Sequence, residues 1–136
     1  MKPVAGRKWL RVLVTVMGLV MVVAGGLTVV FGAAFAPHEG LVTPDVDSEM
    51  RFYAVWYVAM GVLMLRAAPR VESESLVIRL VGGGFFVAGC ARILSWIAVG
   101  RPHVSLVALL VIELMLPVVI IPWQAWVARR WRSTHT

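Results

Sequence analysis

Two residues of opposite charge lie inside long apolar runs of this sequence, and they are its strongest candidates for chemistry. Arg92 interrupts the run over residues 80–99, and Glu113 interrupts the run over residues 104–128. A charged side chain at the centre of a membrane helix costs about 2.5–3.5 kcal/mol on insertion scales, so such residues are rare and are functional candidates by default. As a pair, they could form a salt bridge that fixes helix register. Alternatively, the carboxylate could accept a proton or a cation.

The composition places the elements that hold these charges in lipid. The chain has 136 residues, of which 60% are hydrophobic and only 15% are charged. A soluble domain of this size could not bury so much apolar surface. The net charge is +6, but the basic residues flank the apolar runs, which is typical of membrane topology and argues against a nucleic-acid partner. Cys90 is the only cysteine, which excludes an intrachain disulfide and a cysteine metal cluster.

Four apolar runs are candidates to cross a bilayer, whose hydrocarbon core is about 30 Å thick. The first is longer than a signal-peptide core of about 7–15 residues, and Pro37 follows its cleavage-like Ala34-Phe35-Ala36 end, so we expect a retained helix. We therefore predict an all-α membrane protein with one domain over residues 1–136, a four-transmembrane-helix bundle. The predicted spans are 12–36, 50–65, 80–99 and 104–128.

Basic residues are divided unequally between the two ends of these spans. Most lie before the first span, between the second and third spans, or after the fourth. The two remaining loops with their helix edges hold only Arg51 and Arg101. Because positive residues accumulate on the cytoplasmic side, we predict a multi-pass protein with both termini in the cytoplasm.

Glycines inside the spans predict close packing between helices. Gly18, Gly25 and Gly32 recur at intervals of seven, so they form one stripe along the first span. Gly82 and Gly89 lie in the third span. Small residues in such positions let two helix backbones approach each other. The alternative is that glycine is simply common in membrane helices.

The depths of the two charged residues predict that they meet. At the helical rise, Arg92 lies roughly 10 Å and Glu113 roughly 13 Å from the outer ends of their spans. The tight turn over residues 100–103 makes these spans neighbours. Tyrosines and a serine could supply further hydrogen bonds, although the tyrosines equally suit an interfacial aromatic belt. The expected polar cluster in the outer half of the membrane is Glu49, Arg51, Tyr53, Tyr57, Arg92, Ser95 and Glu113.

Short motifs along most of the chain resemble a known family. They are Glu49-x-Arg51-Phe52-Tyr53, Gly61, Gly89-x-x-Arg92-x-x-Ser95, Gly100-x-Pro102 and Glu113-Leu114. In these motifs the chain is similar to a family of small bacterial four-helix integral membrane proteins known only as a domain of unknown function. The resemblance implies a four-helix bundle in the bacterial plasma (inner) membrane. It also implies one cluster that contains Glu49, Arg51, Tyr53, Arg92 and Glu113, but no activity, substrate or cofactor.

Three functions remain open at this point. The sequence holds no H-E-x-x-H or G-x-S-x-G motif, so we expect a non-enzymatic protein without a metal or a cofactor. The first hypothesis is an accessory or structural subunit of a membrane complex, with the lipid bilayer and other subunits or a second copy as partners. The second is a small proton- or cation-coupled transporter that uses Glu113. The third is lipid or quinone binding, with an aromatic wall of Phe52, Tyr53, Trp56 and Trp96.

Overall fold

Four long helices joined by short connections make up the computed structural model, which describes residues 6–35 and 41–133. Over these residues the chain has no strand, and all four helices are long and apolar enough to cross a membrane. The prediction of an all-α protein with four helices that could cross a membrane is therefore confirmed. The elements are α1 (Arg7–Phe31), η1 (Gly32–Phe35), α2 (Pro44–Ala67), η2 (Ala68–Arg70), α3 (Ser75–Val99) and α4 (Val104–Ser133).

The helices extend beyond the apolar runs that predict them. Helix α2 begins at Pro44 and not near residue 50, because the Thr43 side chain caps it by accepting a hydrogen bond from the Val46 backbone N–H at 3.3 Å. Helix α3 begins five residues before the predicted 80, and α4 continues past the predicted 128. Hydropathy marks only the part of a helix that lipid covers, so polar flanking turns are missed. The predicted end of the first span at residue 36 lies outside the described residues.

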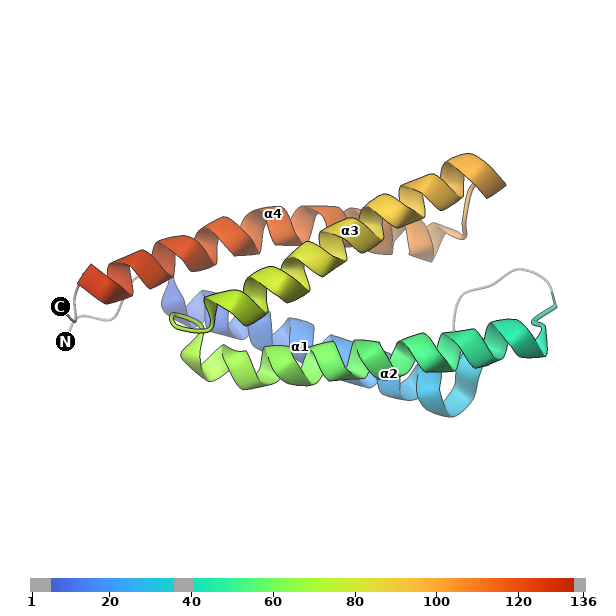
Figure 1. The fold of residues 1–136 in the computed structure, drawn as a ribbon, viewed down its shortest axis with the longest axis horizontal. Coiled ribbons are helices and arrows are strands. Elements are labelled where there is room, and N and C mark those ends of the chain that lie inside the picture. The colour runs from blue at the N-terminus through green and yellow to red at the C-terminus, as the bar shows by residue number, and fades with distance from the viewer. Residues whose placement is uncertain (1–5, 36–40, 134–136) are drawn as a thin grey trace.

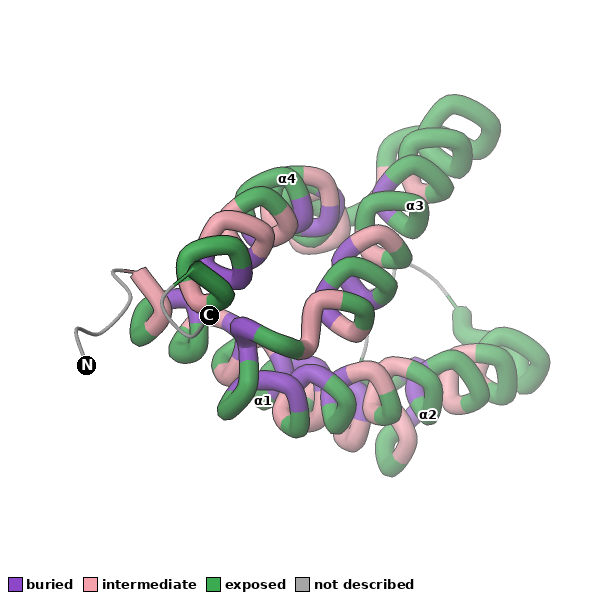
Figure 2. Tube along the Cα trace, turned by 60° about the vertical axis from the view of Figure 1, so that its left-hand side comes forward, coloured by how far each residue is buried: buried purple, intermediate pink, exposed green. Residues whose placement is uncertain are grey.

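The helices form two antiparallel hairpins, α1–α2 and α3–α4 (Figure 1). The hairpins lie close together where α1 begins and α4 ends, and we call this the terminal end. They diverge toward the opposite end, where α2 begins and α3 ends, and we call this the splayed end (Figures 1 and 2). Both ends of the described chain therefore lie at the same end of the bundle.

Glycines bring α1 and α2 into backbone contact, as their stripe predicts. A Cβ added to Gly18 would lie 2.9 Å from the Gly61 carbonyl oxygen, and a Cβ on Gly61 would lie 2.9 Å from that of Gly18. A Cβ on Gly25 would lie 2.8 Å from Val58 Cγ2. Gly32 has a φ of 61°, and a Cβ there would overlap the Asp47 side chain. Only glycine permits this approach, so these glycines lie where α1 and α2 pack most closely.

The second hairpin uses glycine in the same way but less tightly. A Cβ on Gly89 would lie 2.8 Å from Leu114 Cδ2, and one on Gly82 would lie 3.4 Å from Ile121. Both glycines thus pack α3 against α4, as expected. In contrast, a Cβ on Gly83 or Gly84 would meet nothing within 4 Å. This side of α3 is not covered by the other described helices.

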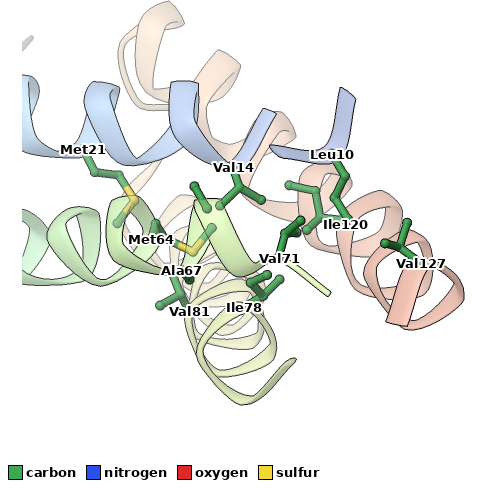
Figure 3. Packing of buried hydrophobic residues seen from close by; sticks show 11 residues of the cluster. Leu10, Val14, Met21, Met64, Ala67, Val71, Ile78, Val81, Ile120 and Val127 are labelled. Atoms are coloured by element: carbon green, nitrogen blue, oxygen red, sulfur yellow. The ribbon is translucent and has the colours of Figure 1, made fainter. Parts of the chain in front are cut away.

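The hydrophobic core lies toward the terminal end, where all four helices meet. Figure 3 shows side chains of α1, α2, α3 and α4 packed around Val71 of the short connection between α2 and α3. The buried residues that Figure 3 labels are Leu10, Val14, Met21, Met64, Ala67, Val71, Ile78, Val81, Ile120 and Val127. The core thus holds the hairpins together at one end and leaves the other end free to diverge.

Candidate functional site

Arg92 and Glu113 form an ion pair between α3 and α4, as the sequence predicts. Arg92 Nε donates a hydrogen bond to Glu113 Oε2 at 2.7 Å. The turn that joins the helices begins at Gly100, whose φ of 120° lies in the region that favours glycine. Glu113 is only 6% exposed, whereas the Arg92 side chain is 39% exposed. The carboxylate is therefore buried in the helix interface while the guanidinium reaches out of it.

The outer edge of the Arg92 guanidinium faces open space on two sides. Among the described residues, its Nη1 and Nη2 atoms have no hydrogen-bond partner. On one side Arg92 lines a cleft with Thr28 of α1 and with Tyr53 and Tyr57 of α2. On the other side it lines a smaller hollow with Ser95. An arginine with unused donors at the mouth of a cleft can bind hydrogen-bond acceptors.

An apolar cavity of about 280 Å³ lies between the two hairpins, with residues from all four helices in its walls. Among the described residues, Glu113 is the only charged one in its lining. Tyr57 lines both this cavity and the cleft that contains Arg92, so the two spaces adjoin each other. Lining residues from each helix include Met17, Met21, Met64, Phe85, Leu109 and Leu116. We call the cavity and the adjoining cleft together the interhairpin site.

Two members of the predicted polar cluster lie elsewhere. Arg51 Nε donates to Asp47 Oδ2 at 2.7 Å, and Arg51 Nη1 donates to the Val29 carbonyl oxygen, also at 2.7 Å. The last carbonyl groups of a helix carry partial negative charge and lack partners within it, so they attract this arginine. Glu49 is exposed on α2. The prediction that Glu49 and Arg51 join the cluster is therefore wrong.

The other predicted members lie near the ion pair without bonding to it: Tyr53 and Tyr57 line the interhairpin site, and Ser95 lines the smaller hollow. Tyr53 is 64% exposed, and the Tyr57 ring is half-buried with its centroid 5.8 Å from that of Phe85. Within the described residues neither tyrosine hydroxyl nor Ser95 hydrogen-bonds to Arg92 or Glu113. The expectation of supporting hydrogen bonds is wrong. For the tyrosines the reason is that the divergence of the hairpins separates α2 from α3 at this depth.

Three members of the predicted aromatic wall are not among the lining residues of the site. Phe52, Trp56 and Trp96 are 58%, 60% and 37% exposed, respectively, and of the four predicted residues only Tyr53 lines the cleft. The rings of Phe52 and Trp56 pack edge to face on the surface of α2, at a centroid distance of 6.5 Å. Aromatic residues in such positions are typical of membrane interfaces.

A second polar site, which the sequence does not predict, joins the elements at the terminal end. Arg7 binds Glu72 through two hydrogen bonds, from Nε to Oε2 at 2.9 Å and from Nη2 to Oε1 at 2.7 Å. The Arg7 guanidinium also lies over the Trp131 ring, 4.9 Å from its centroid. We call these three residues the terminal clasp. It connects α1, the α2–α3 connection and α4, so it fixes the hairpins where they converge.

Gln124 strengthens the same end of the bundle from inside. It is fully buried, and its Nε2 donates to the Val71 carbonyl oxygen at 3.1 Å and to Ser75 Oγ at 2.7 Å. These bonds connect α4 to the start of α3 and to the connection before it. Gln124 Oε1 accepts no hydrogen bond from the described residues, so the two bonds from Nε2 alone specify how these elements pack.

The pKa of Glu72 is set by the terminal clasp. Burial raises the pKa of this carboxyl, but the hydrogen bonds from Arg7 and the charges of Arg7 and Arg11 together lower it more, so it lies below the usual value. A carboxyl with a lower pKa in the folded state stabilises the fold at pH values above its unfolded pKa of about 4.3. That stabilisation is lost as the pH falls through the folded-state pKa.

We expect Glu72→Gln to remove part of the acid sensitivity of the protein. At pH 7 the variant should lose about 1 kcal/mol of unfolding free energy, because a charged hydrogen-bond acceptor is replaced by a neutral one. Below pH 4 the difference from the wild type should shrink. Thermal unfolding in detergent between pH 7 and pH 3 measures both effects. Glu74→Gln is the control, since the 4.0 Å contact of Glu74 with Arg70 is more exposed. Equal acid sensitivity of wild type and Glu72→Gln would contradict this role.

The fold and the site together define a class, that of small four-helix proteins of multi-pass membrane type with an apolar site between two helical hairpins. Residues 9–124 match DUF4345, a domain of unknown function, and the chain belongs to this family. No curated protein and no solved structure matches the chain.

Proposed function

We propose that this protein is a non-enzymatic, multi-pass membrane protein that binds an amphipathic molecule of the bilayer, a lipid or a quinone, in the interhairpin site. One observation carries the proposal: the apolar cavity adjoins a cleft at which Arg92 presents unpaired N–H donors. The tail of the ligand lies in the cavity, and its polar head lies beside Arg92. Such sites, mostly apolar with a few polar groups that orient the ligand, are typical of small-molecule binding.

The cavity favours a hydrocarbon chain over water. A buried water needs about two to four polar partners, and of the described residues that line the cavity only Tyr57 and Glu113 carry polar side-chain N or O atoms. Arg92 already occupies one Glu113 oxygen. An apolar chain instead regains the dispersion contacts that the lining side chains lack on their open side.

The charge distribution supports an orientation for this binding. The terminal end carries most of the arginines, whereas the splayed end carries Arg51 and Arg101. The positive-inside bias therefore favours both termini in the cytoplasm of a bacterial cell. In that orientation the cleft opens in the outer half of the plasma membrane, and a ligand enters sideways between α2 and α3.

Filling the cavity should abolish retention of the ligand. Leu116→Trp places a larger side chain in the cavity wall, whereas Met115→Trp on the same helix adds it to a residue that is 57% exposed. Native mass spectrometry of the protein, released from detergent after purification from its own membranes, measures retained small molecules. We expect a retained molecule in wild type and Met115→Trp and its loss in Leu116→Trp. Equal retention in all three proteins, or none in the wild type, would contradict the proposal.

A role as an accessory subunit of a membrane complex is the second candidate function. The open side of α3 at Gly83 and Gly84 favours it, because a helix of another subunit could approach there closely. Gly84→Leu should then release a partner during purification in mild detergent, whereas Leu94→Ala should not. The Arg92–Glu113 contact weighs against the transporter hypothesis, because Arg92 already neutralises that carboxylate.

A further inference from the structure

The interhairpin site is electrically balanced before any ligand enters. Within the part of the chain that the structure describes, Arg92 and Glu113 are its only charged lining residues, and they are paired at 2.7 Å. An anionic head at Arg92 would place a second negative charge beside Glu113 in a region of low dielectric. A cationic head would find Glu113 buried and already paired with Arg92. The charges therefore favour a neutral head group.

Each polar side chain around the cleft can donate a hydrogen bond, and that of Arg92 can only donate. Arg92 offers its Nη atoms, and Tyr53 and Tyr57 in the same cleft carry hydroxyl groups that can donate. An arginine has no acceptor atom, so the group that binds to it must be an acceptor. A carbonyl oxygen is a neutral acceptor that fits these donors.

The size of the cavity favours one chain. Its volume of about 280 Å³ is about twice that of an engineered cavity of roughly 150 Å³ that binds benzene. A stretch of one hydrocarbon tail suits this volume better than the two tails of a phospholipid side by side.

We infer that the ligand is a neutral, single-tailed molecule whose head carries carbonyl acceptors, which is the chemistry of an isoprenoid quinone. This inference rests on the proposed function and specifies its ligand class. The quinone head accepts hydrogen bonds from Arg92 in the cleft, and the first part of its tail lies in the apolar cavity. Glu113 excludes fatty acids and other single-tailed anions by charge.

A comparison of two probes tests this selectivity. The detergent-solubilised full-length protein is incubated with equal amounts of decylubiquinone, which is neutral, and dodecanoate, which is anionic. Native mass spectrometry then measures how much of each probe is retained. We expect the wild type to retain decylubiquinone at least about tenfold better, because a like charge beside Glu113 opposes the anion.

Removing the charge of Glu113 should change the selectivity. In Glu113→Gln, Arg92 loses its anionic partner, so the ratio of retained dodecanoate to retained decylubiquinone should rise about tenfold. Glu49→Gln is the matched control, because it removes an exposed carboxylate of α2 outside the site. If Glu113→Gln does not fold, the comparison of the two probes on wild type decides by itself.

The outcomes separate the inference from the function on which it rests. If dodecanoate or a two-tailed lipid is retained as well as decylubiquinone, the quinone inference is wrong and the proposed binding function stands. If neither probe is retained and purified wild type carries no bilayer molecule, both are wrong.

Discussion

Replacing Arg92 by methionine will lower the free energy of unfolding by about 3–5 kcal/mol, the cost of leaving a buried ionised partner uncompensated. The partner is Glu113, which is only 6% exposed in the α3–α4 interface. Equilibrium unfolding in mixed micelles measures the change. Glu113→Leu should destabilise less, because the Arg92 side chain is already 39% exposed and can extend toward polar surroundings.

The double variant Arg92→Met with Glu113→Leu separates the structural role of the pair from its binding role. Replacing both charges by apolar residues of similar size is often neutral or stabilising, so its stability should return to within about 1 kcal/mol of wild type. Ligand retention should nevertheless be lost, because the donors at the cleft are gone. A double variant that is stable and still retains the ligand would show that the pair serves the fold alone. A double variant as unstable as Arg92→Met would contradict the explanation that the unpaired Glu113 carboxylate causes the loss of stability.

Replacing Gly61 by valine will lower the free energy of unfolding by about 3 kcal/mol, at the upper end of typical costs for overpacking. A Cβ at this position would lie 2.9 Å from the Gly18 carbonyl oxygen and 2.9 Å from Met21 Cβ. Neither atom belongs to the flexible end of a side chain, so α1 and α2 must move apart. The same unfolding experiment measures the loss.

Gly26→Ala is the control for this prediction. Gly26 lies on the same helix as Gly18, but a Cβ there would meet nothing within 4 Å. Because alanine favours a helix over glycine, the variant should be unchanged or up to about 1 kcal/mol more stable. If Gly26→Ala and Gly61→Val destabilise equally, the close approach of α1 and α2 is not what requires glycine.

The sequence predicts the parts of this structure that depend on local patterns. Arg92 and Glu113 stand out because charge is rare in apolar runs, and the short turn between their helices makes them neighbours. The glycine stripe of α1 is visible for a similar reason, since a spacing of seven keeps residues on one helix face. Both features correspond to contacts within one hairpin.

The remaining features depend on how the two hairpins meet, which no local pattern encodes. Arg7 and Glu72 are 65 residues apart, and Glu72 looks like a solvated loop residue until the fold buries it. The sequence offers Arg51 several possible partners. In the fold it binds a carbonyl group at the end of α1, where carbonyl groups lack partners within the helix. The cavity itself exists because the hairpins diverge. To predict the terminal clasp from sequence, one would need to know which residues vary together among related sequences.

Photo-crosslinking from leucine tests the central claim, that a bilayer molecule occupies the interhairpin site, most directly. Photo-leucine has nearly the size of leucine, so it can replace Leu109 and Leu116 in the cavity wall and Leu19 and Leu94 on exposed faces. After exchange into detergent and illumination, peptide mass spectrometry locates the attached molecules. We predict that an amphipathic molecule of the bilayer is attached at Leu109 and Leu116, and that only detergent is attached at Leu19 and Leu94. Detergent alone at all four positions, or the same lipid at all four, would contradict the claim.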